Sequence, residues 1–558
     1  IAYWYEDNIY NLDAACYTND GKIHEIESDN IFEEEAEKYI VTSMAIPGVE
    51  VGSVIEYKYT LMSKYITMIE PWVFQNKNYT LYSEYTMIIP PGFTFNTVQK
   101  NINPEYFSFN EELIREANNP KERAKRVTWI GEDLPGIKDE PYVDYIKDEY
   151  AQILIIFNAY DYGNYHYTFA KTWNHIAERL NKGYSDILDD KIDLPEELEK
   201  IINGNLETKD KVEEIYNYVS NKIETGKHTG IFSSSLTYFE YIFENKIGSV
   251  SEKNMLLINL YRRLGLEANP LLISKRSNGA IVPNFVDPSQ FNRIICLLEF
   301  NKKKHFLYAG SKYIPFGYLP EQYNVSSGFE VRGDAGSIVR LSPAQFSNSV
   351  DIVTNGKLAD DGTLNFVSTI SYKGYPAYDE RVNLEGEDLS EHISSIVKGI
   401  YETAEVDTFL IADKSIKSPL KIEIHYNITD YVEESDDLMY FTPPLFTNLK
   451  ENRFIREKRT FPVNFSYEKN IFEKCKIELP KNNSISEIPK GKKIKINDYN
   501  YAKRYSTGEN YVQILKMNNR KSRIFKPIEY QKLKAFFEAM LEYDQEQIVL
   551  KKIQTEGK

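Results

Sequence analysis

The chain contains 558 residues, of which 42% are hydrophobic and 14% aromatic, so it can bury several cores and is long enough for three or four domains. Its formal net charge of −16 repels phosphate groups, and no basic stripe interleaved with aromatic residues offsets this charge, so we expect no nucleic-acid partner. No apolar run reaches the length of about 18 residues that a membrane helix needs, and no secretory leader opens the sequence, so we expect no membrane span in this chain.

The first 160 residues alternate apolar and polar positions in short runs. Examples are VGSVIEYKYTLM at 51–62 and YTLYSEYTMII at 79–89, and the pairs Pro47-Gly48 and Pro91-Gly92 mark turns. Alternation with a period of two is typical of half-buried strands. We therefore predict a β-sandwich-like domain over residues 1–160. The acidic stretch at 131–150 lacks the spacing of a calcium loop, and we predict that it is a solvated linker.

The middle of the chain changes to a helical period. Residues 172–180 predict one helix, and a second helix begins at Thr208 with five apolar residues on one face. These five are Val212, Ile215, Tyr216, Val219 and Ile223. Strand-like runs return at 268–274 and 291–300. Together these elements predict an α+β domain over residues 161–328.

Strand patterns dominate the rest of the chain, over residues 329–558. The predicted strands cover residues 364–372, 420–432, 461–467, 474–480 and 511–517, with a helix near 388–403. A last helix is predicted at 527–543, because a Pro precedes an apolar stripe whose opposite face is not notably basic. We expect this helix to pack on the domain before it, which gives a β-rich domain that ends in an amphipathic helix.

Cysteine and histidine residues give no sign of a metal site or a disulfide framework. Cys16, Cys296 and Cys475 are odd in number and widely separated, so we predict that they are small buried hydrophobic residues. The seven histidines show no metal-binding spacing. We therefore expect no metal and no cofactor.

The stretch GSVSEKNMLLINLYRRLG, residues 248–265, predicts a buried helix. Ser249 followed three places later by Glu252 is a capping box, which makes Val250 the first helical residue. Gly265 is the expected C-terminal stop, and apolar residues occur almost all round the helix. Such a helix belongs in the centre of a domain.

Several further segments, together with this Gly-initiated helix, carry a resemblance to a known family. They are SMAIPGVEVGSVIEYKYTL (43–61), WVFQNKNYTLYSEYTMIIPPGFTF (72–95), FAKTWNHIAERL (169–180), SQFNRIICLLEF (289–300), FLYAGS (306–311), IPFGYLP (314–320) and REKRTFPVNFSY (456–467). With them the chain resembles the transglutaminase-like superfamily, and in particular the three-part envelope proteins of Gram-negative bacteria. The resemblance implies an N-terminal β domain of unknown function, a transglutaminase-like core of papain-like fold and a C-terminal β domain.

The resemblance also implies a Cys-His-Asp triad, but this chain lacks it. The family's cysteine starts the buried helix, where the positive end of the helix dipole favours the thiolate. That place is occupied here by Val250, the histidine place by Arg293 and the aspartate place by Tyr308. Valine has no lone pair, arginine stays protonated and tyrosine is neutral at neutral pH. Since losing one member of such a unit typically costs roughly a million-fold in turnover, we expect no thiol chemistry.

These observations lead to a functional hypothesis and two alternatives. We expect a non-enzymatic, degenerate transglutaminase-like protein that binds or scaffolds a protein, peptide or glycan. A fixed cation and phenol at Arg293 and Tyr308, beside Ser249, can line the binding groove. The alternatives are a hydrolase or acyl-transfer enzyme with an unrecognised active site, and a structural subunit of an envelope assembly. The resemblance implies a periplasmic or outer-surface location, and the sequence leaves the ligand and the oligomeric state open.

Overall fold

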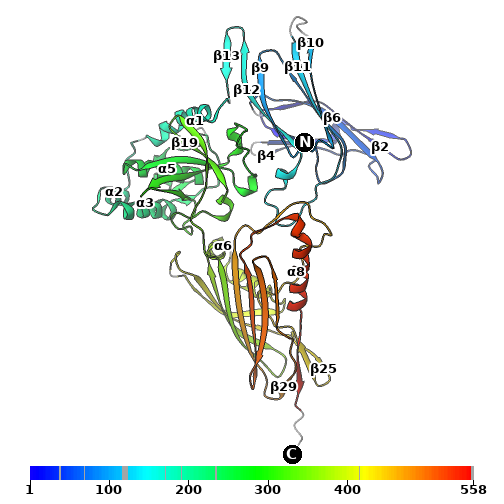
Figure 1. Cartoon of the computed structure of the whole chain (residues 1–558), viewed down its shortest axis with the longest axis vertical. Coiled ribbons are helices and arrows are strands. Elements are labelled where there is room, and N and C mark those ends of the chain that lie inside the picture. Colours follow the sequence, from blue (N-terminus) through cyan, green and yellow to red (C-terminus); the bar gives the residue numbers. More distant parts are fainter. Residues whose placement is uncertain are drawn as a thin grey trace, which may run out of the picture. The chain divides into compact units, whose positions relative to one another are not determined.

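The computed structural model describes residues 1–36, 39–67, 69–115, 123–169, 171–189, 191–232, 236–386, 388–413 and 415–553. The protein is a mixed α and β protein with many sheets, and it divides into two compact units (Figure 1). One unit comprises Ile1–Val73, Glu84–Ile130 and Gln152–Lys171. The other comprises Phe74–Ser83, Gly131–Ala151 and Thr172–Lys558.

The first unit is built from strands, as its alternating sequence predicts. One sheet has the order β1 (Ala2–Trp4), β5 (Tyr39–Met44), β4 (Ile31–Ala36), and a second has the order β3 (Ile23–Glu25), β2 (Asn8–Tyr17), β6 (Val54–Met62). A third has the order β10 (Phe107–Arg115), β11 (Arg123–Leu134), β8 (Thr80–Ile89). The fourth consists of β13 (Tyr165–Thr168), β12 (Gln152–Tyr162), β7 (Trp72–Val73) and β9 (Phe93–Lys100). Buried Trp129 on β11 and buried Phe157 on β12 contribute to the core of this unit.

The second unit begins with helices that pack on a five-stranded sheet, a region of residues 172–341 that we name the central part. Its helices are α1 (Trp173–Leu188), α2 (Glu196–Asn203), α3 (Thr208–Lys222), α4 (Phe239–Asn245) and α5 (Val250–Arg263). Its sheet has the order β18 (Lys303–Leu307), β17 (Arg293–Phe300), β16 (Glu267–Ile273), β19 (Ser327–Arg332), β20 (Ala335–Arg340). The two-residue strands β14 (Glu224–Thr225) and β15 (Ile247–Gly248) form a small parallel pair. The predicted helices at 172 and 208 and both predicted strands are confirmed.

Helix α5 is the buried helix that the sequence predicts. Ser249 is its N-cap, and the capping box with Glu252 is complete. Every residue from Val250 to Tyr261 is buried, because α5 packs on β16 and β17 and against α1 and α3. Gly265 has a φ of +74°, the left-handed conformation that ends a helix with no steric cost to glycine. Capping and all-round hydrophobicity therefore place the start of α5 inside the central part.

Residues 349–553 form a second region of this unit, which we name the C-terminal part. Its main sheet has the order β23 (Ala404–Ala412), β24 (Leu420–Ile428), β22 (Leu364–Lys373), β21 (Ser349–Leu358), β28 (Lys469–Glu478), β32 (Tyr511–Arg520), β31 (Tyr499–Thr507), β30 (Lys492–Ile496). Its helices are α6 (Tyr375–Gly386), α7 (Leu389–Lys398) and α8 (Tyr530–Asp544), and α8 lies beside the strands drawn in orange in Figure 1.

Two expectations for the C-terminal part need correction. The predicted terminal helix exists as α8, but it is followed by β34 (Ile548–Lys552), so this region does not end in a helix. β34 joins a four-stranded sheet with the order β25 (Glu433–Ser435), β26 (Leu438–Phe441), β34, β29 (Asn483–Glu487). The predicted strand at 461–467 is reduced to β27 (Val463–Asn464), which pairs with β33 (Ile524–Phe525). Phe465 leaves the strand to join an aromatic core with Phe454 and Phe537.

The predicted solvated linker is in part a packed segment, residues 139–151, which we name the strap. Glu140 accepts hydrogen bonds from the N–H groups of Thr460 and Phe461 at 3.0 and 3.1 Å and pairs with Arg459 at 3.4 Å. Asp144 accepts from Arg276 of the central part and from Asn464 of the C-terminal part. The acidic residues thus have buried partners, which the linear sequence does not show. The strap connects the two parts of the second unit.

Candidate functional site

The start of α5 is held by a dense set of hydrogen bonds. The Glu252 carboxylate accepts from the Ser249 N–H at 2.6 Å and from the Thr237 N–H and hydroxyl at 2.8 and 2.7 Å. In return the Glu252 N–H donates to the Ser249 hydroxyl at 3.3 Å. Burial raises the pKa of Glu252, but these hydrogen bonds outweigh it and leave the pKa below its usual value of 4.5.

The depressed pKa of Glu252 predicts an acid-sensitive helix start. A carboxyl whose folded pKa lies below its unfolded value contributes stability above the unfolded pKa, and this stability is lost as the pH falls through the folded pKa. We expect Glu252→Gln to lower the thermal unfolding midpoint at about pH 7 but to narrow its difference from the wild type at about pH 3.5. Calorimetry of both proteins at the two pH values tests this. If the unfolding midpoints of the two proteins differ equally at both pH values, the prediction is wrong.

The three positions that the resemblance assigns to a triad, Val250, Arg293 and Tyr308, lie near this helix start. The Val250 and Tyr308 side chains belong to one hydrophobic cluster, and both border Gly310. The Tyr308 ring lies 4.5 Å from the ring of Tyr323, measured between centroids. Arg293, half-buried at the start of β17, acts on the phenol of Tyr323 by charge and hydrogen bonding, which partly offsets the rise that burial causes in the Tyr323 pKa.

The helix start is filled with side chains. Val250 has an exposed fraction of 9%, Tyr308 of 6% and Ser249 of 2%. Burial raises the pKa of Tyr308 well above its usual value, so its phenol stays neutral. Neither the junction cleft nor the α7–β23 groove, both described below, is lined by Ser249, Arg293 or Tyr308. Ligand binding by these three residues therefore stays a prediction.

One pair of reactive groups beside this helix start was not predicted from the sequence. The Lys253 side chain is buried, and its amine donates to the Ile223 carbonyl at 2.6 Å and contacts the hydroxyl of exposed Thr225 at 3.1 Å. The Thr225 hydroxyl in turn donates to the carbonyl of Gly310 at 2.9 Å. Burial lowers the pKa of Lys253 to about 7. The available signal was a lysine one position after Glu252 in a helix that the sequence predicts to be buried.

A cleft of about 600 Å³ opens where the central part, the C-terminal part and the strap meet, and we name it the junction cleft. Hydroxyl and amide side chains dominate its lining, together with Tyr467 and Phe346. The polar residues are Ser274, Asn324, Ser326, Ser327, Ser342, Gln345, Asn348, Asn464 and Ser466. Asn324 is the chain neighbour of Tyr323, so the cleft begins one residue from the ring that covers Tyr308.

Three arginines and three carboxylates line the junction cleft. Arg276 is neutralised by ion pairs with Asp144 and Glu321. Arg340 and Arg523 are exposed, and neither has an ion-pair partner among the residues that the structure describes. Asp148 accepts a hydrogen bond from the Ala280 N–H at 2.7 Å. The cleft therefore offers two guanidinium groups that can pair with a carboxylate of a ligand.

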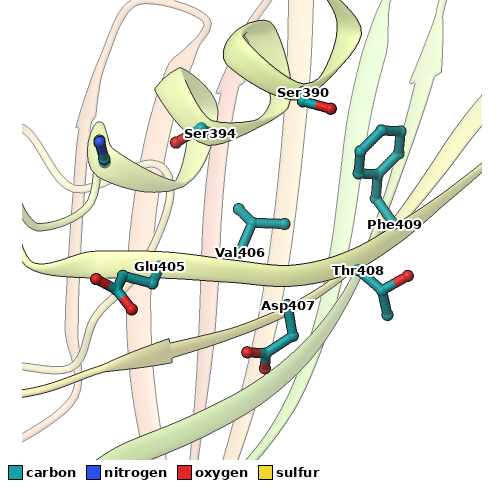
Figure 2. A pocket seen from close by; sticks show the side chains of 8 residues that line it. Ser390, Ser394, Glu405, Val406, Asp407, Thr408 and Phe409 are labelled. Atoms are coloured by element: carbon teal, nitrogen blue, oxygen red, sulfur yellow. The ribbon is translucent and has the colours of Figure 1, made fainter.

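A second hollow, the α7–β23 groove, has a volume of about 380 Å³. Figure 2 shows Val406 and Phe409 pointing toward α7, while Glu405 and Asp407 point to the other side of the strand. A bulge between Val406 and Thr408 causes this pattern, because one extra residue shifts the alternation of side chains. Ser390 and Ser394 of α7 form the opposite wall.

Among the described residues, no group of three or more His, Cys, Asp or Glu side chains is placed to hold a metal ion. All three cysteines are buried and free, which confirms the prediction that they are core residues. Burial raises the pKa of Cys296 and of Cys475, so both stay thiols. None of the helices in the described ranges is long and apolar enough to cross a membrane.

Comparisons with known proteins match both ends of the chain. Residues 1–138 match DUF3857 and residues 437–550 match DUF3858, each a domain of unknown function with a solved structure. No curated protein matches the chain. The crystal structure of "a putative protease from Parabacteroides distasonis" is similar over 98% of this chain and 92% of that chain, with a TM-score of 0.55 and 10% identity. At this identity the similarity concerns the fold.

A second solved structure, "a putative cysteine protease from Cytophaga hutchinsonii", is 13% identical and covers 48% of this chain and 90% of that chain, but its TM-score of 0.16 supports no argument. The expectation that the chain is not an enzyme is wrong by these comparisons, because the structure that shares its fold over nearly its whole length is described as a protease. The absence of a Cys-His-Asp pattern in the sequence concerns thiol chemistry alone and says nothing of other reactions. The chain thus has a three-part layout with domains of unknown function on both sides of its middle.

Proposed function

We propose that the chain binds an extended peptide in the junction cleft. The observation that carries this proposal is the cleft itself, whose volume of about 600 Å³ lies within the usual range for ligand sites, roughly 300–1,000 Å³. Hydroxyl and amide side chains can both donate and accept hydrogen bonds, so they suit the alternating N–H and C=O groups of a peptide backbone. A peptide ligand also agrees with the description of the similar solved structure as a protease.

The charges of the junction cleft favour a peptide that carries a carboxylate. Arg340 of the central part and Arg523 of the C-terminal part both line it without an ion-pair partner in the described ranges. A guanidinium group binds a carboxylate through two parallel hydrogen bonds, which fixes the orientation of the ligand. Tyr467 and Phe346 supply apolar faces for a side chain next to that carboxylate.

We further propose a family for the middle of the chain. Residues 161–328 are a transglutaminase-like core of papain-like fold, with Val250, Arg293 and Tyr308 at the places of the triad. Their gathering at the start of α5 supports this alignment. The junction cleft then lies beside the place where the family's reaction occurs. A location in the cell envelope follows from the resemblance.

Fluorescence anisotropy with labelled hexapeptides tests peptide binding. We expect peptides that contain Asp or Glu to bind, and the same peptides with Asn or Gln in those places to bind more weakly. Arg340→Ala and Arg523→Ala should each weaken binding roughly tenfold, since a hydrogen bond to a charged group contributes about 1.5–3 kcal/mol. Lys398→Ala, which removes a cation from the α7–β23 groove, is the matched control and should bind normally. Equal affinity of all three variants for the peptide would rule out the junction cleft as its binding site.

A second candidate function is peptide hydrolysis by Thr225. The solved structure with the same fold is named "a putative protease", and the hydroxyl of Thr225, an exposed residue, lies 3.1 Å from the amine of Lys253. An amine with a pKa of about 7 is half-neutral near pH 7 and can accept the hydroxyl proton. We expect casein hydrolysis by the wild type and its loss in both Thr225→Val and Lys253→Met. Turnover that persists in Thr225→Val would exclude this nucleophile, and Thr229→Val, which changes a threonine in the segment after β14, is the control.

A further inference from the structure

The main sheet of the C-terminal part carries a cluster of charged side chains on the face that α8 covers. Glu473, Lys503 and Lys516 have exposed fractions of 0%, and Asp544 one of 1%. Lys516 on β32 lies directly opposite Glu473 on β28 and Lys503 on β31, so the three residues form one row across the sheet. Asp544 is the last residue of α8. Neither the junction cleft nor the start of α5 uses this cluster.

Three reactive groups meet at the end of the Lys516 side chain. Its amine lies 2.8 Å from Asp544 Oδ2, 3.2 Å from Asn448 Oδ1 and 2.7 Å from the Thr447 carbonyl oxygen. Asp544 is fixed by hydrogen bonds from the Tyr501 hydroxyl at 2.7 Å and from the Leu449 N–H at 2.8 Å. A primary amine and a carboxylate, both buried, are therefore held together with a partly buried carboxamide.

We propose that Lys516 and Asn448 form an intramolecular amide cross-link. Asp544 takes a proton from the Lys516 ammonium, and the free amine attacks Cγ of Asn448. As the new Cγ–Nζ bond forms and the Cγ–Nδ2 bond breaks, Asp544 returns this proton to Nδ2, which leaves as ammonia. Asp544 then takes the second proton that Nζ loses on becoming an amide and passes it to the ammonia, which departs as an ammonium ion. Overall, one ammonium side chain and one carboxamide become one secondary amide and one ammonium ion. No oxidant, reductant or other reactant is needed.

The surroundings favour the forward reaction. Burial lowers the pKa of Lys516, so more of its side chain is the free amine that can attack. Burial also raises the pKa of Glu473, the carboxyl opposite Lys516. After the reaction Asp544 keeps a cationic partner, since Lys503 Nζ lies 4.0 Å from its Oδ1. An amide removes a buried charge, and the exclusion of water protects the amide from hydrolysis.

The cross-link would attach the segment around Asn448 to the main sheet. This segment precedes Arg459, Thr460 and Phe461, which bind the strap. Asn448 and Lys516 are separated by 68 positions in the chain. Closing a loop of this length by a covalent bond restricts the unfolded chain, as a disulfide does. The bond would therefore stabilise the C-terminal part without any cysteine, all three of which are free.

Intact-mass spectrometry of the purified wild-type chain tests the cross-link without any variant. We expect a mass lower than that of the sequence by one ammonia, and a branched tryptic peptide that joins the segments containing Asn448 and Lys516. Lys516→Arg should show its full mass, whereas Lys503→Arg, a change of the neighbouring buried lysine, should still lose one ammonia. A wild-type chain of full mass would overturn the proposal. Loss of one water with a branch at Asp544 would overturn the assignment to Asn448.

Discussion

Replacing Asp544 with alanine is expected to destabilise the C-terminal part by about 3–5 kcal/mol, the cost of breaking a buried ion pair from one side. The substitution removes the proposed base of the cross-link, so Lys516 stays an ammonium group with an exposed fraction of 0%, and it loses the carboxylate that lies 2.8 Å away. It also removes the acceptor of the Tyr501 hydroxyl and of the Leu449 N–H. Burial already lowers the pKa of Lys503 to about 8, with Asp544 as the main opposing influence.

Hydrogen exchange of the β31 and β32 amides is the appropriate measurement of this effect. The four tryptophans are Trp4, Trp72, Trp129 and Trp173, so their fluorescence does not report on the C-terminal part. Glu538→Ala removes another carboxylate of α8, one whose side chain is 54% exposed and pairs with Lys534 at 3.9 Å, and it should cost no more than about 0.5 kcal/mol. If both substitutions destabilise the C-terminal part equally, the buried charge cluster contributes no more to its stability than an exposed ion pair does.

Replacing Glu140 with alanine is expected to detach the strap from the C-terminal part. The side chains of Glu140 and Arg459 are only 4% and 2% exposed, so the substitution leaves a buried guanidinium without its carboxylate, at a cost of about 3–5 kcal/mol. It also leaves the N–H groups of Thr460 and Phe461 without an acceptor. Because the strap contributes Asp144 and Asp148 to the junction cleft, peptide binding should weaken as well.

The neighbouring residue provides the control for Glu140. Asp139 is exposed, so Asp139→Ala makes the same change in charge without breaking a buried pair. Exchange of the β27 and β33 amides, which lie beyond the direct partners of Glu140, should become roughly a hundredfold faster in Glu140→Ala and stay unchanged in Asp139→Ala. Unchanged exchange in both variants would mean that Glu140 does not hold the strap.

Local sequence signals predicted elements well and buried charges poorly. The Ser249 and Glu252 spacing predicted the capping box, because both partners lie within one turn. The alternation of inward and outward side chains in two strands does indicate the buried cluster. Lys516 continues the inward face of Val512 and Ile514, and Glu473 lies on the inward face of Cys475 and Ile477.

The candidate site had even less support in the sequence. The junction cleft combines residues from segments near positions 144, 276, 324, 464 and 523, and no local pattern links segments so far apart. The acidic strap appeared solvated because the partner of Glu140, Arg459, lies more than 300 positions away in the chain. Family resemblance located the positions at the start of α5, but the filling of that place by Tyr308 and Tyr323 depends on tertiary packing.

Hydrogen–deuterium exchange with and without a bound acidic hexapeptide tests peptide binding in the junction cleft most directly. We predict slower exchange at residues 274–281, 324–327 and 340–346, which line the cleft. Arg523→Ala should abolish this protection at the same peptide concentration. Protection confined to α7 and β23, the walls of the groove in Figure 2, would contradict the account and place the peptide there instead.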